Sequence, residues 1–243
     1  MPHQLWLTEF LNHYLAGPVT ALLRMLGIEP AYPKAPISNF VAMELLVFAI
    51  LIVFFLLVRA RLSVDKPGGT QHVVEILQEY VTDQAEQVIG HDYKRYVPYV
   101  IALGYFILIA NFIGVIPGFE SPTANPSVPL GCALCTWIYY HYHGIRQHKA
   151  HYIKQFLGPV WWMVPLMFVI EIISHLARIL SLTVRLFANI YAGDMITLAF
   201  FSLAPLVVPV IFLGLHLGVS IVQTFIFIML TMVYLGMAVG EEH

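Results

Sequence analysis

Several charged and titratable side chains stand inside an apolar segment in the last third of the chain. The segment reads EIISHLARILSLTVRLFANIYAGD and begins at Glu171. A charge at the centre of a membrane-spanning helix costs about 2.5–3.5 kcal/mol on insertion scales, so such residues mark functional sites by default. Carboxylates and imidazoles exchange protons near neutral pH, and chains of them are typical of proton relays. These residue types predict proton transfer rather than bond-making chemistry.

The spacing of these groups predicts one polar stripe along a helix. Intervals of four, three, seven and four residues separate its members, which are Glu171, His175, Arg178, Arg185 and Asn189. At about 100° per residue these intervals return to the same face. Contact with lipid would be costly for such a stripe, so it must face water or protein. Ser181, one turn before Arg185, is a secondary candidate, as are His175 and Arg178.

Arg185 needs an acidic partner that its own helix does not provide, because a guanidinium stays protonated in proteins. Along the helix axis, Glu171 lies about 21 Å before Arg185 and Asp194 about 13 Å after it. Asp194 also points to the opposite side of the helix. After Pro209 the chain has no Asp or Glu until Glu241. We therefore expect the partner carboxylate to lie on another chain; the alternative is a static buried ion pair or a side chain that extends to the membrane surface.

The last apolar segment carries two further polar groups. His216 and Gln223 are seven residues apart and share one helix face. If the two segments pack side by side, four polar side chains would surround one cavity: Asp194, Asn189, His216 and Gln223. Glu171 lies on the other side of Arg185. A permanent cation between two relay regions repels protons, so the pattern predicts two half-channels separated by an electrostatic barrier.

The composition places these groups in a membrane. The chain has 243 residues, of which 59% are hydrophobic and 11% charged, and its mean hydropathy is +0.78. An ordinary soluble domain is about 25% charged. The net charge of −2 offers no basic field for nucleic acid. We expect a single all-α integral membrane domain over residues 1–243, with lipid contact, no nucleic-acid partner and no cofactor.

Apolar runs and turns predict about five membrane crossings and one amphipathic surface helix. The expected elements are an external segment 1–40, a span 41–58, the surface helix 70–90, hairpin spans 96–117 and 128–143, and two long segments 158–203 and 206–240. A continuous helix between Pro165 and Pro205 would be about 57 Å long, so the last two helices are either strongly tilted or broken. Glu75, Glu79, Asp83 and Glu86 make the polar face of the surface helix acidic, which favours docking on protein over binding to anionic lipid.

The basic residues predict the orientation, since Lys and Arg collect in cytoplasmic loops. They lie between the first and second spans and between the third and fourth: Arg59, Arg61, Lys66, Lys94, Arg95, Arg146, Lys149 and Lys154. The loop around Glu120 and the tail Glu241, Glu242, His243 contain none. An outside N-terminus and a cytoplasmic C-terminus satisfy every loop.

Two other groups of residues favour structure over chemistry. Cys132 and Cys135 lie in PLGCALCTWIYY, where small residues favour close helix packing rather than redox chemistry. The stretch HYHGIRQHKAH holds four histidines, His141, His143, His148 and His151. Their spacing matches no strong metal-ligand motif. We interpret this stretch as a soluble basic loop without a metal.

The two polar segments resemble subunit a of the F-type ATP synthases. SLTVRLFANIYAGD is similar to the family's Ser-Leu-x-x-Arg-Leu-Phe-Gly-Asn-x-Tyr-Ala-Gly-Glu, and HLGVSIVQTFIFIMLTMVYLGMAVGEEH extends the likeness, which covers nearly the whole chain. Ala188 replaces a usual Gly, Asp194 replaces Glu, and Ile179 stands where Pro is common.

The resemblance implies partners and roles. Arg185 would face the ion-carrying carboxylate of the rotating subunit c ring. The half-channel open to the outside would be formed by Asp194, Asn189, His216 and Gln223, and Glu171 would belong to the half-channel open to the cytoplasm. H⁺ would be the translocated ion, subunit b of the peripheral stalk a further partner, and the bacterial inner membrane the location. The sequence contains no GxxxxGK[ST] nucleotide loop, so we expect a subunit that is not catalytic by itself.

Two other classes of function remain as alternatives. In a self-contained secondary transporter, Arg185 would bind an anionic substrate, but such proteins often show internal repeats and the sequence has no convincing one. In an intramembrane enzyme, Ser174 and His175 would act together, but adjacent helical side chains point about 100° apart. Both alternatives are less consistent with the stripe than a proton channel is.

Overall fold

The computed structural model describes residues 5–29, 32, 35–63, 68–90, 92–116, 118–149, 152, 164–203 and 208–240. Several residues used above lie outside this part of the chain: Lys66, His151, Lys154, Pro205 and the tail Glu241, Glu242, His243. The same holds for residues 158–163 and 206–207, which begin the two long segments expected from the sequence.

The helices of the described residues confirm an all-α fold. They are α1 (Trp6–Met25), α2 (Asn39–Ala60), α3 (Gly69–Ile89), α4 (Val97–Ile113), α5 (Ser127–His148), α7 (Val164–Leu203) and α8 (Val208–Val239). Two short 3₁₀ turns accompany them, η1 (Tyr93–Arg95) and η2 (Pro122–Ala124). Three helices are long and apolar enough to cross a membrane, namely α2, residues 164–200 of α7 and residues 210–239 of α8, and α4 is a shorter apolar helix.

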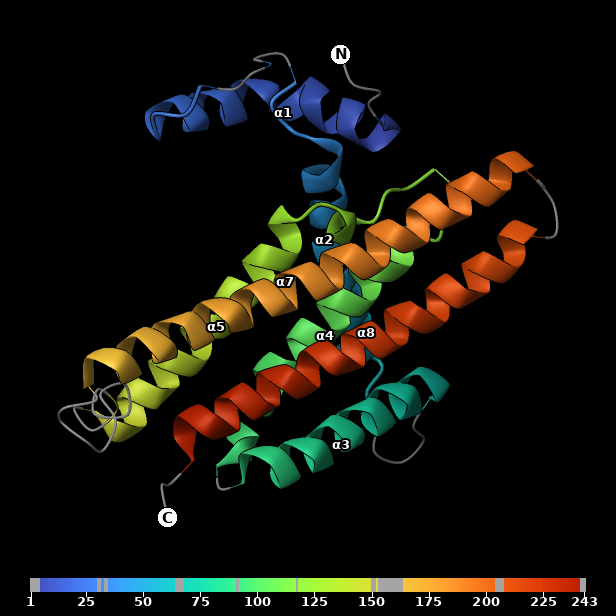
Figure 1. The fold of residues 1–243 in the computed structure, drawn as a ribbon. Coiled ribbons are helices and arrows are strands. Elements are labelled where there is room, and N and C mark those ends of the chain that lie inside the picture. Colours follow the sequence, from blue (N-terminus) through green and yellow to red (C-terminus); the bar gives the residue numbers. More distant parts are fainter. Residues whose placement is uncertain are drawn as a thin grey trace.

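The helices cross one another rather than forming a parallel bundle. Figure 1 shows α7 and α8 side by side on a slant, with α2 running steeply behind them. At one end of α2 lies α1, and at the other end α3 runs along α8. We call these the α1 end and the α3 end. Helix α4 packs on α8, α5 packs on both α7 and α8, and both α4 and α5 contact the 3₁₀ turn η2 that lies between them in the chain. Apolar side chains from α2, α4, α5, α7 and α8 form a common core.

Helices α7 and α8 are each unbroken, which resolves the two possibilities left by their length. At 40 and 32 residues, they are about 60 Å and 48 Å long. Pro165 and Pro209 each lie in the first turn, where the missing N–H of proline has no helical acceptor to lose. Only 17% of the apolar window of α7 is buried within the chain, so most of this apolar helix lies on the surface of the chain.

The N-terminal segment contains a helix that the sequence pattern did not predict. Asn12 of α1 holds it to the chain before α2, because its side-chain amide donates to the Ile37 carbonyl at 3.0 Å and accepts from the Ile37 N–H at 3.1 Å. The backbone N–H of Leu5 donates to Asn39 Oδ1 at 3.2 Å. These contacts keep α1 across the end of α2 (Figure 1).

The interpretation of HYHGIRQHKAH as a soluble loop is wrong for residues 141–148, which form the last two turns of α5. His141 and His143 are buried. Aromatic rings cover them: Trp137 and Tyr152 pack on His141, and Tyr96 packs on His143. This aromatic shell allows the helix to continue past its apolar run, and it ends at Lys149, whose φ is 49°.

Helix α3 packs on α8 through a close backbone approach. Its C-terminal half is partly buried there, with Ala85 and Ile89 in the core. Val73 and Leu77, on the apolar face expected to dock on protein, stay exposed in the chain. A Cβ added at Gly236 of α8 would lie 2.6 Å from the Val88 carbonyl oxygen, so this crossing requires a residue without a side chain.

We predict that Gly236→Ala weakens the contact between α3 and α8. The added methyl must displace backbone, and overpacking of this kind costs about 1–3 kcal/mol. The melting temperature of the purified protein in detergent should fall by about 2–4 °C per kcal/mol. Gly218→Ala on the same helix is the matched control, since a Cβ there meets nothing within 4 Å. Equal melting temperatures for the two variants would contradict the prediction.

Candidate functional site

The polar residues of α7 and α8 meet where the two helices pack. Asn189 Nδ2 donates to Gln223 Oε1 at 2.7 Å. One to two turns away, His216 Nδ1 lies 3.7 Å from Asp194 Oδ1. The structure thus pairs the four residues that the sequence assigned to one cavity, two from each helix.

A glycine makes the second of these contacts possible. A Cβ added at Gly193 would lie 2.6 Å from His216 Nδ1, so the imidazole packs directly on the backbone of α7. Beside it is a cavity of about 180 Å³ whose lining includes Asn189, Gly193 and His216. Asp194 and Gln223 are not part of this lining but contact His216 and Asn189. A cavity of this size can hold several water molecules.

Two polar atoms at this contact are buried without a hydrogen-bond partner among the described residues. They are Nε2 of His216 and Nε2 of Gln223. Leaving a buried polar group unsatisfied costs about 1–3 kcal/mol. Both atoms therefore favour a site that exchanges hydrogen bonds with water or an ion over a packed apolar core.

A second carboxylate lies near Asp194 and was not proposed from the sequence. Glu120, in the connection between α4 and α5, is close enough for its charge to interact with that of Asp194. Asn39 Nδ2 donates to Glu120 Oε1 at 3.4 Å. The turn-rich loop gave no helical register from which this approach could be predicted. Acidic groups from two elements therefore stand at the α1 end of the polar contact.

Arg185 forms no ion pair with any described residue. Its Nη2 donates to Ser181 Oγ at 3.3 Å, one turn earlier on α7. Two apolar side chains of the same helical region, Leu180 and Val184, are exposed. Arg178 differs, because its guanidinium lies 5.1 Å from the centre of the Tyr234 ring on α8. Among the described residues no acid pairs with Arg185, and the expectation that its partner lies on another chain stays a prediction.

Toward the α3 end, Glu171 and His175 form a hydrogen-bonded unit with α5. His175 Nε2 lies 3.2 Å from Glu171 Oε1, and its Nδ1 lies 3.0 Å from the Tyr140 hydroxyl. Glu171, His175 and Arg178 also line a cavity of about 40 Å³ together with tyrosines of α5 and α8. The stripe predicted on α7 is thus divided: its first three members turn toward α5 and α8, and Asn189 turns toward Gln223.

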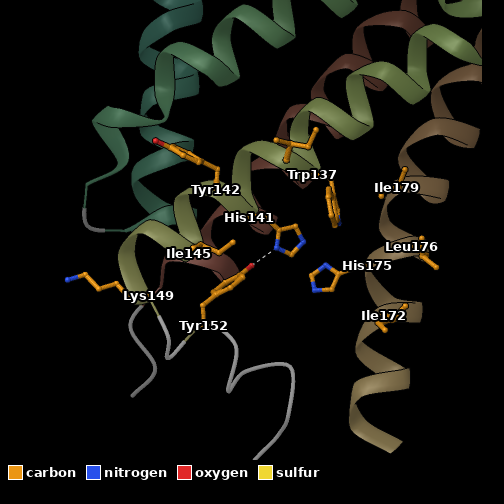
Figure 2. Close-up of a pocket in the computed structure, with 11 residues that line it drawn as sticks. Trp137, His141, Tyr142, Ile145, Lys149, Tyr152, Ile172, His175, Leu176 and Ile179 are labelled. Atoms are coloured by element: carbon orange, nitrogen blue, oxygen red, sulfur yellow. Dashed lines mark hydrogen bonds between the residues drawn. The ribbon is translucent and has the colours of Figure 1, made fainter. Parts of the chain in front are cut away.

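The sequence did not point to Tyr140, His141 or Tyr152 as partners of this unit. Figure 2 shows His175 directed from α7 toward His141, which accepts or donates a hydrogen bond of 2.8 Å with the Tyr152 hydroxyl. The His141 and His175 rings are 4.6 Å apart. Burial raises the pKa of Tyr152 to about 12, so this hydroxyl stays protonated. The only available signal was the histidine-rich stretch, and its spacing did not identify a neighbour.

The contacts of His175 do not support an enzyme based on Ser174. Both ring nitrogens are directed at Glu171 and Tyr140, whereas a nucleophile–base pair requires a direct hydrogen bond. Among the described residues no group of three or more His, Cys, Asp or Glu side chains could hold a metal ion. Cys132 is buried, Cys135 is exposed, and both are free thiols.

Comparison with known proteins assigns the family. A family model described as ATP synthase A chain matches residues 41–236. The chain is 59% identical over 244 residues to ATP synthase subunit a of Koribacter versatilis, covering 100% of both chains. It is 47% identical over 233 residues to ATP synthase subunit a of Solibacter usitatus, covering 96% of this chain and 99% of that protein. The chain belongs to the ATP synthase A chain family.

More distant members extend the same result. ATP synthase subunit a of Geobacter sulfurreducens is 39% identical over 216 residues, covering 89% of this chain and 94% of that protein. The family match includes every candidate site residue from Glu171 to Gln223, and α1 lies before it. The resemblance to subunit a of F-type ATP synthases is confirmed. As a member of the ATP synthase A chain family, the chain is a multi-pass membrane component of a complex for ATP synthesis and proton transport.

We predict that Gly193→Ala impairs proton transport by displacing His216. The new methyl would overlap the imidazole, and the His216–Asp194 contact would open. ATP-driven acidification of vesicles that contain the assembled complex should fall severalfold, with unchanged amounts of the subunit in the membrane. Gly214→Ala on α8 is the matched control, since a Cβ there meets nothing within 4 Å. Normal acidification by Gly193→Ala would show that this contact is dispensable.

Proposed function

We propose that this chain is the stator channel of the membrane sector of an F-type ATP synthase. It provides two offset proton half-channels, and Arg185 separates them and faces a carboxylate of the rotating subunit c ring. A proton enters one half-channel, neutralises a ring carboxylate released from Arg185, travels with the ring and leaves through the other half-channel. ATP chemistry takes place on other subunits, and the chain itself is not catalytic.

The observation that carries this proposal is the environment of Arg185. A permanent cation stands in a long apolar helix without an acidic partner among the described residues. The apolar side chain of Val184, next to it in the sequence of α7, is exposed. Such a charge is costly in the membrane unless another group compensates it. A carboxylate presented by a neighbouring subunit supplies that compensation.

The two polar groups on either side of Arg185 support separate half-channels. Toward the α1 end, the cavity beside His216 and the nearby Asp194 suit the half-channel open to the outside. Toward the α3 end, Glu171 and its partners suit the half-channel open to the cytoplasm. Asn189 lies one turn after Arg185 on α7, and its 2.7 Å hydrogen bond to Gln223 Oε1 joins α7 to α8 next to the arginine.

We infer five crossings, by α2, α4, α5, α7 and α8, in a bacterial inner membrane. Arg59, Arg61, Lys94 and Arg95 lie on either side of α3, and Arg146 and Lys149 lie at the end of α5. Basic residues mark the cytoplasmic side, so the α3 end and the C-terminus are cytoplasmic and the N-terminus is outside. The exposed apolar surface of α2 and the first half of α3 suits subunit b of the peripheral stalk or lipid.

We predict that Arg185→Ala abolishes pumping while passive conduction persists. The assembled complex would be placed in sealed vesicles, and ATP-driven acidification and passive proton leak would be recorded separately. Pumping should fall at least tenfold, since removal of a charge from a low-dielectric site changes a barrier by more than about 1.4 kcal/mol. Passive leak should be retained or increased, because the barrier between the half-channels is lost.

Arg59→Ala is the matched control, since Arg59 is exposed at the end of α2. Near-normal pumping by Arg185→Ala would reduce this residue to a structural cation and overturn the proposal. Saturable uptake of an anion by the purified chain alone would instead favour a self-contained secondary transporter.

A further inference from the structure

His175 contacts Glu171 on α7 and is hydrogen-bonded on its other nitrogen to Tyr140 on α5. His175 lies between them, with Nε2 3.2 Å from Glu171 Oε1 and Nδ1 3.0 Å from the Tyr140 hydroxyl. Tyr140 is 2% exposed and belongs to α5, whereas Glu171 and His175 belong to α7. The imidazole is therefore fixed at both nitrogens by groups from two helices.

Packing around the ring leaves it little freedom to turn. The His141 ring lies 4.6 Å from the His175 ring, and the Trp137 ring lies 4.4 Å from that of His141. On the outer side the two imidazoles border an apolar groove of about 690 Å³ between α5 and α7, formed mainly by isoleucine, leucine and aromatic side chains (Figure 2). An apolar groove offers few alternative hydrogen bonds, so the partners of His175 determine where its protons reside.

A hydroxyl suits both protonation states of such a unit, because it can donate and accept. When Glu171 is ionised, Nε2–H of His175 donates to it and Nδ1 accepts from the Tyr140 hydroxyl. When the pair gains one proton from the half-channel, the ring carries hydrogen on both nitrogens: Nε2–H remains bonded to Glu171, and Nδ1–H donates to the Tyr140 oxygen. Rotation of one O–H bond accommodates the change without movement of the ring.

We propose that Tyr140 is a positioning residue for proton transfer at Glu171, which it serves by keeping His175 aligned in both protonation states of the Glu171–His175 pair. This inference rests on the proposed function, in which Glu171 belongs to the cytoplasmic half-channel. Tyr140 does not itself exchange protons with the ring carboxylate. It acts on Glu171 through the imidazole, and its hydroxyl is also within hydrogen-bond reach of Arg178.

Charged and titratable groups surround His175 from every element packed against it. They are Glu171 and Arg178 on α7, Tyr140 and His141 on α5, Tyr152 after α5, and Tyr234 on α8. The Arg178 guanidinium and the Glu171 carboxylate place charges of opposite sign around the same small cavity as the ring. A change in pH dependence must therefore be assigned to the Tyr140–His175–Glu171 unit by combining substitutions rather than from one variant.

Tyr140→Phe removes only the hydroxyl and keeps the buried ring. In vesicles that contain the assembled complex, ATP-driven acidification should fall by about three- to tenfold, the range expected for one lost hydrogen bond. The pH of half-maximal acidification should fall. In the protonated pair the substitution removes a charge-assisted bond from Nδ1–H, whereas in the deprotonated pair it removes a weaker bond to Nδ1, so the protonated pair is destabilised more. Tyr142→Phe, on the same helix but with an exposed side chain, should match the parent.

The double variant Tyr140→Phe/Glu171→Gln separates positioning from packing. If Tyr140 acts through His175 on Glu171, the double variant should pump like Glu171→Gln alone and show no further pH shift. If Tyr140 only stabilises the fold, Tyr140→Phe should reduce acidification by the same factor whether residue 171 is Glu or Gln, and the inference would be wrong. Parent-like rate and pH profile for Tyr140→Phe would also overturn it.

Failure of this inference is distinguishable from failure of the channel proposal. Parent-like behaviour of Tyr140→Phe, together with lost pumping in Arg185→Ala, would reject the role of Tyr140 alone. Normal pumping by Arg185→Ala would reject the channel proposal whatever Tyr140→Phe shows.

Discussion

The rest of the structure depends on one uncompensated charge, the guanidinium of Arg185. Water would solvate it cheaply, but its position in α7 is bordered by apolar side chains that face away from the chain. An arginine cannot lower this cost by losing its proton. The chain gives it one hydroxyl, that of Ser181, and no carboxylate among the described residues. A charge held at such cost supports the proposal that a carboxylate of a neighbouring subunit compensates it.

The slanted pair of helices follows from the same requirement. A long α7 places a group of titratable side chains on each side of Arg185, and α8 contributes the complement to one of them. The packing is specific: Gly193 allows His216 to reach Asp194, and Asn189 binds Gln223. Toward the other end, α5 rather than α8 supplies the main partner, because Tyr140 reaches His175. The proposed half-channels open to opposite sides of the membrane, which agrees with one polar group contacting α8 and the other contacting α5.

Helical periodicity predicted that Glu171, Arg185 and Asn189 lie along one helix, and α7 confirms the helix. It predicted one continuous stripe, whereas the structure divides these residues between different neighbours. The sequence also indicated which polar residues of α7 and α8 would meet if the two helices packed side by side, and the structure pairs Asn189 with Gln223 and Asp194 with His216. Periodicity could not predict which helix would cover the Glu171 end, so the role of Tyr140 and Tyr152 was missed. It also misjudged residues 141–148, because burial of those histidines depends on aromatic rings from distant parts of the chain. Gly193 and Gly236 carry no side-chain signal, although close helix crossings depend on both.

The most direct test of the account is the structure of the assembled membrane complex at a resolution that shows side chains. The distance to measure is from the Arg185 guanidinium to the nearest carboxylate of a neighbouring subunit. The account predicts a carboxylate of the rotating ring within about 4 Å, or bridged by one water molecule, in at least one rotational state. An Arg185 side chain that faces lipid or a carboxylate of its own chain in every state would contradict it.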